Sequence, residues 1–225
     1  MTKIILTRHG KTQWNARPRF HGRIDLALSK AGIEQARATC KRIRATLGWK
    51  PSAVYTSPMR RCVVTGRIIC EPFRLTAEPV DGLNDIEYGE WQGLTADEVK
   101  TRWPEEFRIW SHTPHLSKLP GGETLQEVLA RASSALDDIL RRHPHDTIVL
   151  VGHSSVNRVI LLHALGLPLS RYRCLWQDMC AVSELNFSPR SGFSIKLIND
   201  TYHLRLLHRH HRLGRSGRAI SDPTR

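Results

Sequence analysis

Two short apolar segments, each followed by a histidine, constrain the fold of this chain more than any other feature. The first covers residues 3–7 and runs into Arg8 and His9. The second covers residues 147–151 and ends just before His153. Both have the length and apolar content of a buried strand. Because ligands of open α/β sheets bind at the carboxyl ends of the strands, both histidines are expected at one edge of a sheet.

Helix and strand patterns alternate along the rest of the chain. Helical periodicity and capping residues are recognisable in five segments, which begin at Ser29, Ser57, Thr95, Thr124 and Val156. Further strands are expected over residues 53–56, 181–187 and 193–198, the last two as a terminal hairpin. Strands that alternate with helices predict a three-layer α/β/α sandwich, with a mostly parallel sheet and an antiparallel edge strand. We therefore expect one domain over residues 1–202, including a loop-rich cap segment at about 81–122.

Charge and cysteine content limit the classes of partner and compartment. The net charge of +13 suits anionic substrates through electrostatic steering, and it also suits nucleic acid. No apolar run reaches the roughly 18 residues of a membrane span, and the first apolar stretch is too short for a signal peptide. The five cysteines show no Cys-x-x-Cys spacing, which indicates a reduced chain. We expect a cytoplasmic protein without a membrane partner and with a flexible basic tail over residues 203–225.

The expected strand ends supply side chains suited to phosphoryl transfer. A phosphoryl group in transit carries negative charge on three oxygens, so its site needs several cationic or donor groups. Arg8, Arg60 and His153 are expected to surround His9, which is the candidate covalent nucleophile. Nearby arginines disfavour the protonated form of His9, and its second ring nitrogen needs an acceptor such as a backbone carbonyl. His153 is interpreted as a group that can carry positive charge.

Several longer motifs follow one another in order over residues 3–190. They are Leu6-Thr7-Arg8-His9-Gly10-x-Thr12-x-x-Asn15, Gly22-x-x-Asp25, Ser57-Pro58-Met59-Arg60-Arg61-x-x-x-Thr65, Leu83-x-Asp85-x-x-Tyr88-Gly89-x-Trp91-x-Gly93, Pro120-Gly121-Gly122-Glu123-Thr124 and Gly152-His153. With these motifs the chain resembles the histidine phosphatase superfamily, in the branch of cofactor-dependent phosphoglycerate mutases and related phosphatases. The resemblance implies that His9 is phosphorylated, that Arg8, Arg60 and His153 bind the phosphoryl group, and that Asn15 helps to position it. We expect neither a cofactor nor a metal site.

A carboxylic acid is also needed opposite the nucleophile, because the leaving alkoxide must receive a proton. The family pattern implies Asp85, at a position where glutamate is usual. Its shorter side chain keeps Glu87 as a rival. The resemblance further implies a substrate-binding set that comprises His21, Gly22, Glu87, Gly122 and Glu123. Lys11 and His21 depart from the family pattern, and they either bind a second anionic group of the substrate or are solvated.

The reaction that fits best is hydrolysis of a small phosphorylated metabolite through a phosphohistidine. A mutase is the alternative, but the mutases typically have a longer middle segment and an Arg-His pair where this chain has Ile86-Glu87. A binding protein that uses the basic tail on nucleic acid is a third reading, and the intact catalytic set argues against it. Nucleic acid is therefore not expected as a partner. The patterns indicate neither the individual substrate nor the oligomeric state.

Overall fold

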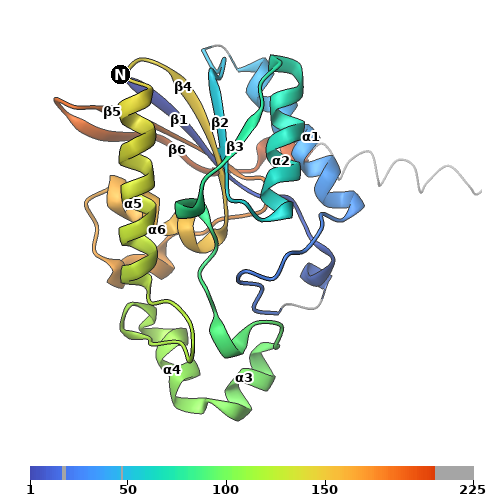
Figure 1. Ribbon diagram of the computed structural model, residues 1–225, viewed down its shortest axis with the longest axis vertical. Coiled ribbons are helices and arrows are strands. Elements are labelled where there is room, and N and C mark those ends of the chain that lie inside the picture. Colours follow the sequence, from blue (N-terminus) through green and yellow to red (C-terminus); the bar gives the residue numbers. More distant parts are fainter. Residues whose placement is uncertain (17–18, 47, 206–225) are drawn as a thin grey trace, which may run out of the picture.

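A six-stranded sheet with the order β3-β2-β4-β1-β5-β6 forms the centre of the molecule (Figure 1). The computed structural model describes residues 1–16, 19–46 and 48–205. Four neighbouring strands are parallel, namely β1 (Thr2–Arg8), β2 (Ala53–Thr56), β3 (Ala77–Pro79) and β4 (Thr147–Gly152). The hairpin of β5 (Val182–Ser188) and β6 (Gly192–Asp200) adds antiparallel strands beside β1. This mixed sheet confirms the predicted α/β class, whereas β3 was not expected from the sequence.

Helices cover both faces of the sheet and complete the predicted three layers (Figure 1). One face carries α1 (Lys30–Ala45) and α2 (Arg60–Cys70), and the other carries α5 (Leu125–Arg142) and α6 (Ser154–Ala164). The alternation of side chains along β1 explains this arrangement, because successive residues of a strand point to opposite faces. Ile4 and Leu6 belong to the apolar core that includes α5 and α6 residues, whereas Ile5 packs with the core that includes α1 and α2 residues.

The cap segment lies below the carboxyl edge of the parallel strands (Figure 1). It contains α3 (Ala96–Arg102) and α4 (Pro104–His112). The capping boxes predicted at Thr95 and Thr124 are both present, with reciprocal hydrogen bonds to the glutamate three residues later. The second cap helix was not expected, although Pro104 occupies a first-turn position that favours helix initiation.

Short 3₁₀ helices occupy several of the connections. They are Gln13–Ala16, Glu71–Phe73, Asp81–Leu83, Gly89–Trp91, Pro114–Leu116 and Leu169–Cys174. Within the described residues, none of the helices combines the length and the apolar content needed to cross a membrane.

The packed body extends beyond the domain boundary that the sequence suggests. A helical turn follows β6, and its residues His203 and Leu204 are buried. The Nε2 atom of His203 lies 3.1 Å from Oγ1 of Thr39 and 3.0 Å from the carbonyl oxygen of Cys180. The predicted boundary just before His203 is therefore too early, because these contacts join the turn to α1. The rest of the predicted tail, residues 206–225, lies outside the described part of the chain.

Candidate active site

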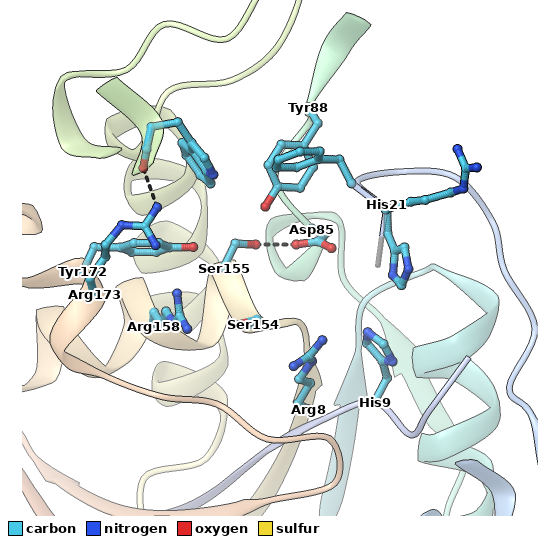
Figure 2. Close-up of a pocket in the computed structure, with 13 residues that line it drawn as sticks. Arg8, His9, His21, Asp85, Tyr88, Ser154, Ser155, Arg158, Tyr172 and Arg173 are labelled. Carbon is cyan, nitrogen blue, oxygen red and sulfur yellow. Dashed lines mark hydrogen bonds between the residues drawn. The ribbon is translucent and has the colours of Figure 1, made fainter. Parts of the chain in front are cut away.

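A pocket of about 310 Å³ opens at the carboxyl edge of the sheet, between the strands and the cap segment (Figure 2). It is lined by Arg8, His9, Arg19, Phe20, His21, Asp85, Tyr88, Trp110, Ser154, Ser155, Arg158, Tyr172 and Arg173. His9 follows β1 and Ser154 begins α6 after β4, so the two central parallel strands both end at this pocket. The placement agrees with the expectation that both histidine-bearing segments meet at one sheet edge.

His9 is buried at the base of the pocket and has the geometry of a neutral nucleophile. Its Nδ1 atom lies 2.8 Å from the carbonyl oxygen of Gly10. Since a carbonyl oxygen only accepts, Nδ1 carries the proton and Nε2 keeps its lone pair. Burial, followed by repulsion from Arg61 and Arg8, lowers the pKa of His9 well below 6.5. The expected backbone-carbonyl partner is therefore confirmed.

The arginine of α2 that lies beside His153 and Asp85 is Arg61, whereas the predicted Arg60 has an exposed side chain. Both belong to the first turn of α2, but successive helical residues point about 100° apart. The side chain of Arg60 is exposed, and its backbone N–H donates to the carboxylate of Asp25 at 2.7 Å. Arg61 is completely buried and donates to the carbonyl oxygens of Gly22 at 2.6 Å and Ile24 at 2.8 Å. Its guanidinium is thereby fixed behind the pocket wall, and Arg61 does not belong to the lining in the described structure.

Arg61 also joins the two other candidate catalytic groups. Its Nε–H donates to Nδ1 of His153 at 3.3 Å, and its Nη2 lies 3.4 Å from Oδ2 of Asp85. The rings of His153 and His9 lie 5.1 Å apart. Burial and the neighbouring Arg61 lower the pKa of His153 well below 6.5. The structure therefore favours a neutral His153 rather than the positively charged ring considered from the sequence.

Arg8 completes the cationic side of the pocket base. It is the last residue of β1, and its Nη1 donates to the carbonyl oxygen of Gln177 at 2.8 Å. Burial lowers the pKa of Arg8, while the charge of Asp85 opposes this effect. Guanidinium groups stay protonated under these conditions, so Arg8 places a permanent positive charge beside His9.

Asp85 is the carboxylate that reaches the pocket. The hydroxyl of Ser155 and the backbone N–H of Ile86 both donate to its Oδ1 atom, the latter at 3.0 Å. Figure 2 shows the carboxylate above Arg8 and His9, so it lies across the pocket from the nucleophile. The rival Glu87 is absent from the pocket lining in the described structure, and its Oε2 atom pairs with Nε of Arg23 at 3.3 Å. The geometry therefore supports Asp85 as the candidate acid.

Glu123, predicted to bind substrate, instead braces the loop that carries Asp85. Two nitrogens of Arg131 donate to its carboxylate at 2.9 and 3.0 Å. The guanidinium of Arg131 also binds the carbonyl oxygens of Gly82, Asn84 and Asp85. Glu123 does not line the pocket in the described structure because these contacts engage it.

Gly22 and Gly122, also predicted to bind substrate, have backbone geometries that shape the loops. A Cβ atom at Gly122 would lie 2.4 Å from the carbonyl oxygen of Glu87, so only glycine permits this close approach of the two backbones. Gly22 has a φ of +51° and offers its carbonyl oxygen to Arg61. Both glycines therefore shape the loops around the pocket, and neither belongs to its lining in the described structure.

The remaining predicted residues separate into three cases. His21 lines the pocket, where burial lowers its pKa to about 4, with Arg61 contributing. It therefore faces the substrate space as a neutral ring at pH 7. Lys11 has an exposed side chain, as expected of a solvated residue. Asn15 belongs to the 3₁₀ helix Gln13–Ala16, but its side chain lies outside the described part of the structure.

Several pocket residues were missed by the sequence analysis. Ser155 and Arg158 follow His153 within the first turns of α6, so the helical period after a strand-end histidine is a usable signal for them. Tyr88 belongs to the motif that contains Asp85, and its position there was the only signal. Arg173 enters from the 3₁₀ helix Leu169–Cys174, and no local pattern places this segment over the pocket.

Comparisons with known proteins identify the family of this chain. The profile of the histidine phosphatase superfamily (branch 1) matches residues 4–201. Phosphoserine phosphatase 1 of Hydrogenobacter thermophilus is 33% identical over 205 residues, which cover 91% of this chain and 95% of the relative. A probable 2-carboxy-D-arabinitol-1-phosphatase of Arabidopsis thaliana is 30% identical over 190 residues, or 84% of this chain and 39% of that longer protein.

Solved structures give the same result. YhfR of Bacillus stearothermophilus superposes with a TM-score of 0.85 at 28% identity, covering 91% of this chain and all of that one. A mycobacterial glucosyl-3-phosphoglycerate phosphatase shares the fold with a TM-score of 0.79 at 23% identity, covering 88% and 99% of the two chains. The match over nearly the whole chain shows that this protein is a member of branch 1 of the histidine phosphatase superfamily.

Proposed function

We propose that this chain hydrolyses phosphomonoesters of small metabolites through a phosphohistidine at His9. The observation that carries the proposal is the neutral His9 ring, with Nδ1 bound to Gly10 and Nε2 available for attack. Arg8 and Arg61 supply positive charge beside it, and Asp85 supplies a carboxyl group across the pocket. Relatives named for phosphoserine and 2-carboxy-D-arabinitol 1-phosphate support a small phosphorylated substrate.

In the first step, Nε2 of His9 attacks phosphorus and forms a nitrogen–phosphorus bond. The bond between phosphorus and the ester oxygen breaks, and its electron pair stays on that oxygen. Asp85 in its protonated form donates a proton to the leaving oxygen, so the product is a neutral alcohol. The arginine side chains stabilise the charge on the three phosphoryl oxygens during the transfer.

In the second step, water replaces His9 on phosphorus. The carboxylate of Asp85 accepts a proton from the water molecule while its oxygen attacks the phosphorus atom. The nitrogen–phosphorus bond breaks, and its electron pair returns to Nε2. Inorganic phosphate leaves, and both His9 and Asp85 return to their starting protonation states.

The experiment that tests this function measures phosphate release from a panel of phosphomonoesters and searches for acid-labile phosphohistidine after rapid quenching. His9→Ala is the control, and we expect it to abolish both phosphate release and the phosphorylated intermediate. The mutase alternative is tested in the same assays with 3-phosphoglycerate and 2,3-bisphosphoglycerate as primer. Primer-dependent isomerisation with negligible phosphate release would overturn the hydrolase in favour of the mutase.

A further inference from the structure

Four arginines line the pocket, which is more positive charge than one phosphoryl group requires. They are Arg8, Arg19, Arg158 and Arg173, and Asp85 is the single acidic side chain among the described lining residues. Arg19 donates to the carbonyl oxygen of Gly93 and pairs with Glu98 at 3.4 Å. Arg173 donates to the carbonyl oxygen of Trp110. Arg8 is placed to bind the phosphoryl group at His9, and Arg19 and Arg173 are engaged by the contacts above. Arg158 is therefore the lining arginine that can bind another group of the substrate.

Arg158 is held in place by aromatic rings rather than by a carboxylate. Its guanidinium carbon lies 5.0 Å from the ring centre of Tyr172 and 5.6 Å from that of Trp176. Its Nε atom is buried and has no hydrogen-bond partner among the described residues, and the guanidinium also hydrogen-bonds to the hydroxyl of Tyr172. None of the ion pairs among the described residues involves Arg158. Stacking fixes the plane of a guanidinium while leaving its N–H groups free to donate.

The position of Arg158 suits a group that is part of the same substrate. It belongs to α6 and lies on the side of the pocket opposite His9 and His21 (Figure 2). The organic part of a phosphate ester bound at His9 can therefore extend within the pocket to Arg158. The pocket volume of about 310 Å³ is at the small end of ligand sites, which suits a short molecule.

We propose, resting on the hydrolase function above, that Arg158 binds a carboxylate of the substrate and that the enzyme selects phosphate esters of small carboxylic acids. A planar guanidinium with a fixed orientation matches the two oxygens of a carboxylate. A second phosphate group would carry more charge and more acceptor oxygens than this one arginine can satisfy. Arg158 is thus a specificity-determining residue, distinct from the groups around His9.

Two matched pairs of substrates test this proposal. Phosphoserine is compared with phosphoethanolamine, and 3-phosphoglycerate with glycerol 3-phosphate, because each pair differs at the carboxylate. We expect the wild type to prefer the carboxylated member by about 10- to 100-fold in kcat/KM, the usual effect of one charge-assisted hydrogen-bonded contact. Arg158→Met should bring this preference ratio close to one, and Arg158→Lys should retain part of it. The ratio cancels any loss that both substrates share.

Arg173→Met is the matched control, since Arg173 lines the same pocket but donates to a backbone carbonyl. Arg173→Met should keep the preference for the carboxylated substrate. If this preference is lost in Arg173→Met but retained in Arg158→Met, the assignment is overturned. Fructose 1,6-bisphosphate compared with fructose 6-phosphate tests a second phosphate instead. A stronger preference for the bisphosphate than for the carboxylated esters would likewise contradict the proposal.

The outcomes separate the two levels of the proposal. Equal hydrolysis within each pair, together with turnover of p-nitrophenyl phosphate, would reject the carboxylate site and leave the hydrolase function intact. Absence of turnover and of phosphohistidine on every ester would reject the hydrolase function itself. If Arg158→Met does not fold, inhibition of wild-type p-nitrophenyl phosphate hydrolysis decides the question. There, 3-phosphoglycerate should inhibit at least about tenfold more strongly than glycerol 3-phosphate, and equal inhibition would overturn the proposal.

Discussion

The hydroxyl group of Ser155 donates a hydrogen bond to the carboxylate of Asp85, joining the first turn of α6 to the loop after β3. Both side chains are buried. The backbone N–H of Ile86 contacts the same pair, at 3.0 Å from Asp85 Oδ1 and 3.2 Å from Ser155 Oγ. With Oδ1 engaged in this way and Oδ2 near Arg61, the carboxyl group has a defined orientation in the pocket.

Loss of this hydroxyl should weaken proton donation more than it weakens the other steps. We expect Ser155→Ala to lower kcat on alkyl phosphates by about tenfold, the size of one lost hydrogen bond to a charged group. The loss on p-nitrophenyl phosphate should be about threefold or less, because that leaving group departs without a proton. Steady-state kinetics on both esters check this prediction. Equal losses on the two esters would show that Ser155 acts only on the general packing of the site.

The same comparison of leaving groups distinguishes the two carboxylates. Asp85→Asn should reduce kcat/KM on an alkyl phosphate by about 10²- to 10⁴-fold, the usual contribution of a general acid, and much less on p-nitrophenyl phosphate. Glu87→Gln should affect both esters similarly and by less than about threefold. Its carboxylate pairs with Arg23 outside the pocket, so the change removes a partly exposed ion pair. A larger selective loss in Glu87→Gln would reverse the assignment.

Arg60 and Arg61 form a natural pair for a second test. Arg61→Gln removes donors from Gly22, Ile24, His153 and Asp85, which leaves buried acceptors without partners. We expect a loss of activity above about 100-fold and a decrease of about 3 kcal/mol in the free energy of unfolding. Arg60→Gln should change stability by no more than about 0.5 kcal/mol, because the side chain is exposed. Kinetics and urea denaturation of both variants measure the contrast, and similar behaviour of the two would contradict the structure.

The buried histidines predict how stability depends on pH. The pKa values of His9 and His153 lie well below 6.5, so both rings are neutral in the folded and the unfolded chain above that pH. As the pH falls below 6.5, these histidines bind protons in the unfolded chain but not in the folded chain. The free energy of unfolding therefore decreases until the pH reaches the lowered pKa of the folded state. Each ring contributes a slope of about 1.4 kcal/mol per pH unit in this window.

Urea denaturation between pH 7.5 and 5 measures this slope. His9→Gln should flatten it by about one proton, because glutamine does not titrate. His21→Gln should flatten it by nearly as much, because a folded pKa of about 4 leaves the His21 ring almost unprotonated above pH 5. An unchanged slope in His9→Gln would mean that this ring titrates alike in both states.

The parts of the molecule that follow from local patterns could be predicted from the sequence. The strands that lead into His9 and His153, the helix cap at Ser29 and both capping boxes depend on residues close in the chain. Edge strand β3 has three residues, too few for a recognisable alternation, and was missed. Helix α4 was missed for a different reason, since Trp103 is the single residue between α3 and α4.

Side-chain direction was the harder part of the site. The choice between Arg60 and Arg61 depends on where α2 begins, and a shift of one residue turns a buried side chain into an exposed one. Glu123 belongs to a motif near the pocket, but its carboxylate accepts hydrogen bonds from Arg131 of α5. The guanidinium of Arg158 stacks on the rings of Tyr172 and Trp176, which belong to the segment after α6. Such contacts depend on tertiary packing, so no local pattern contains them.

Backbone hydrogen bonds join the two ends of the cap segment. The backbone N–H of Glu90 donates to the carbonyl oxygen of Pro120 at 2.9 Å, and that of Glu123 donates to Glu87 at 2.8 Å. Residues 91–119 therefore form one long segment whose two ends are joined by these backbone hydrogen bonds. Asp85 lies outside this segment. An exchange of this stretch for that of a relative should change which esters are accepted while the transfer chemistry stays. The fold thus allows this stretch to vary while the groups around His9 and Arg158 keep their places.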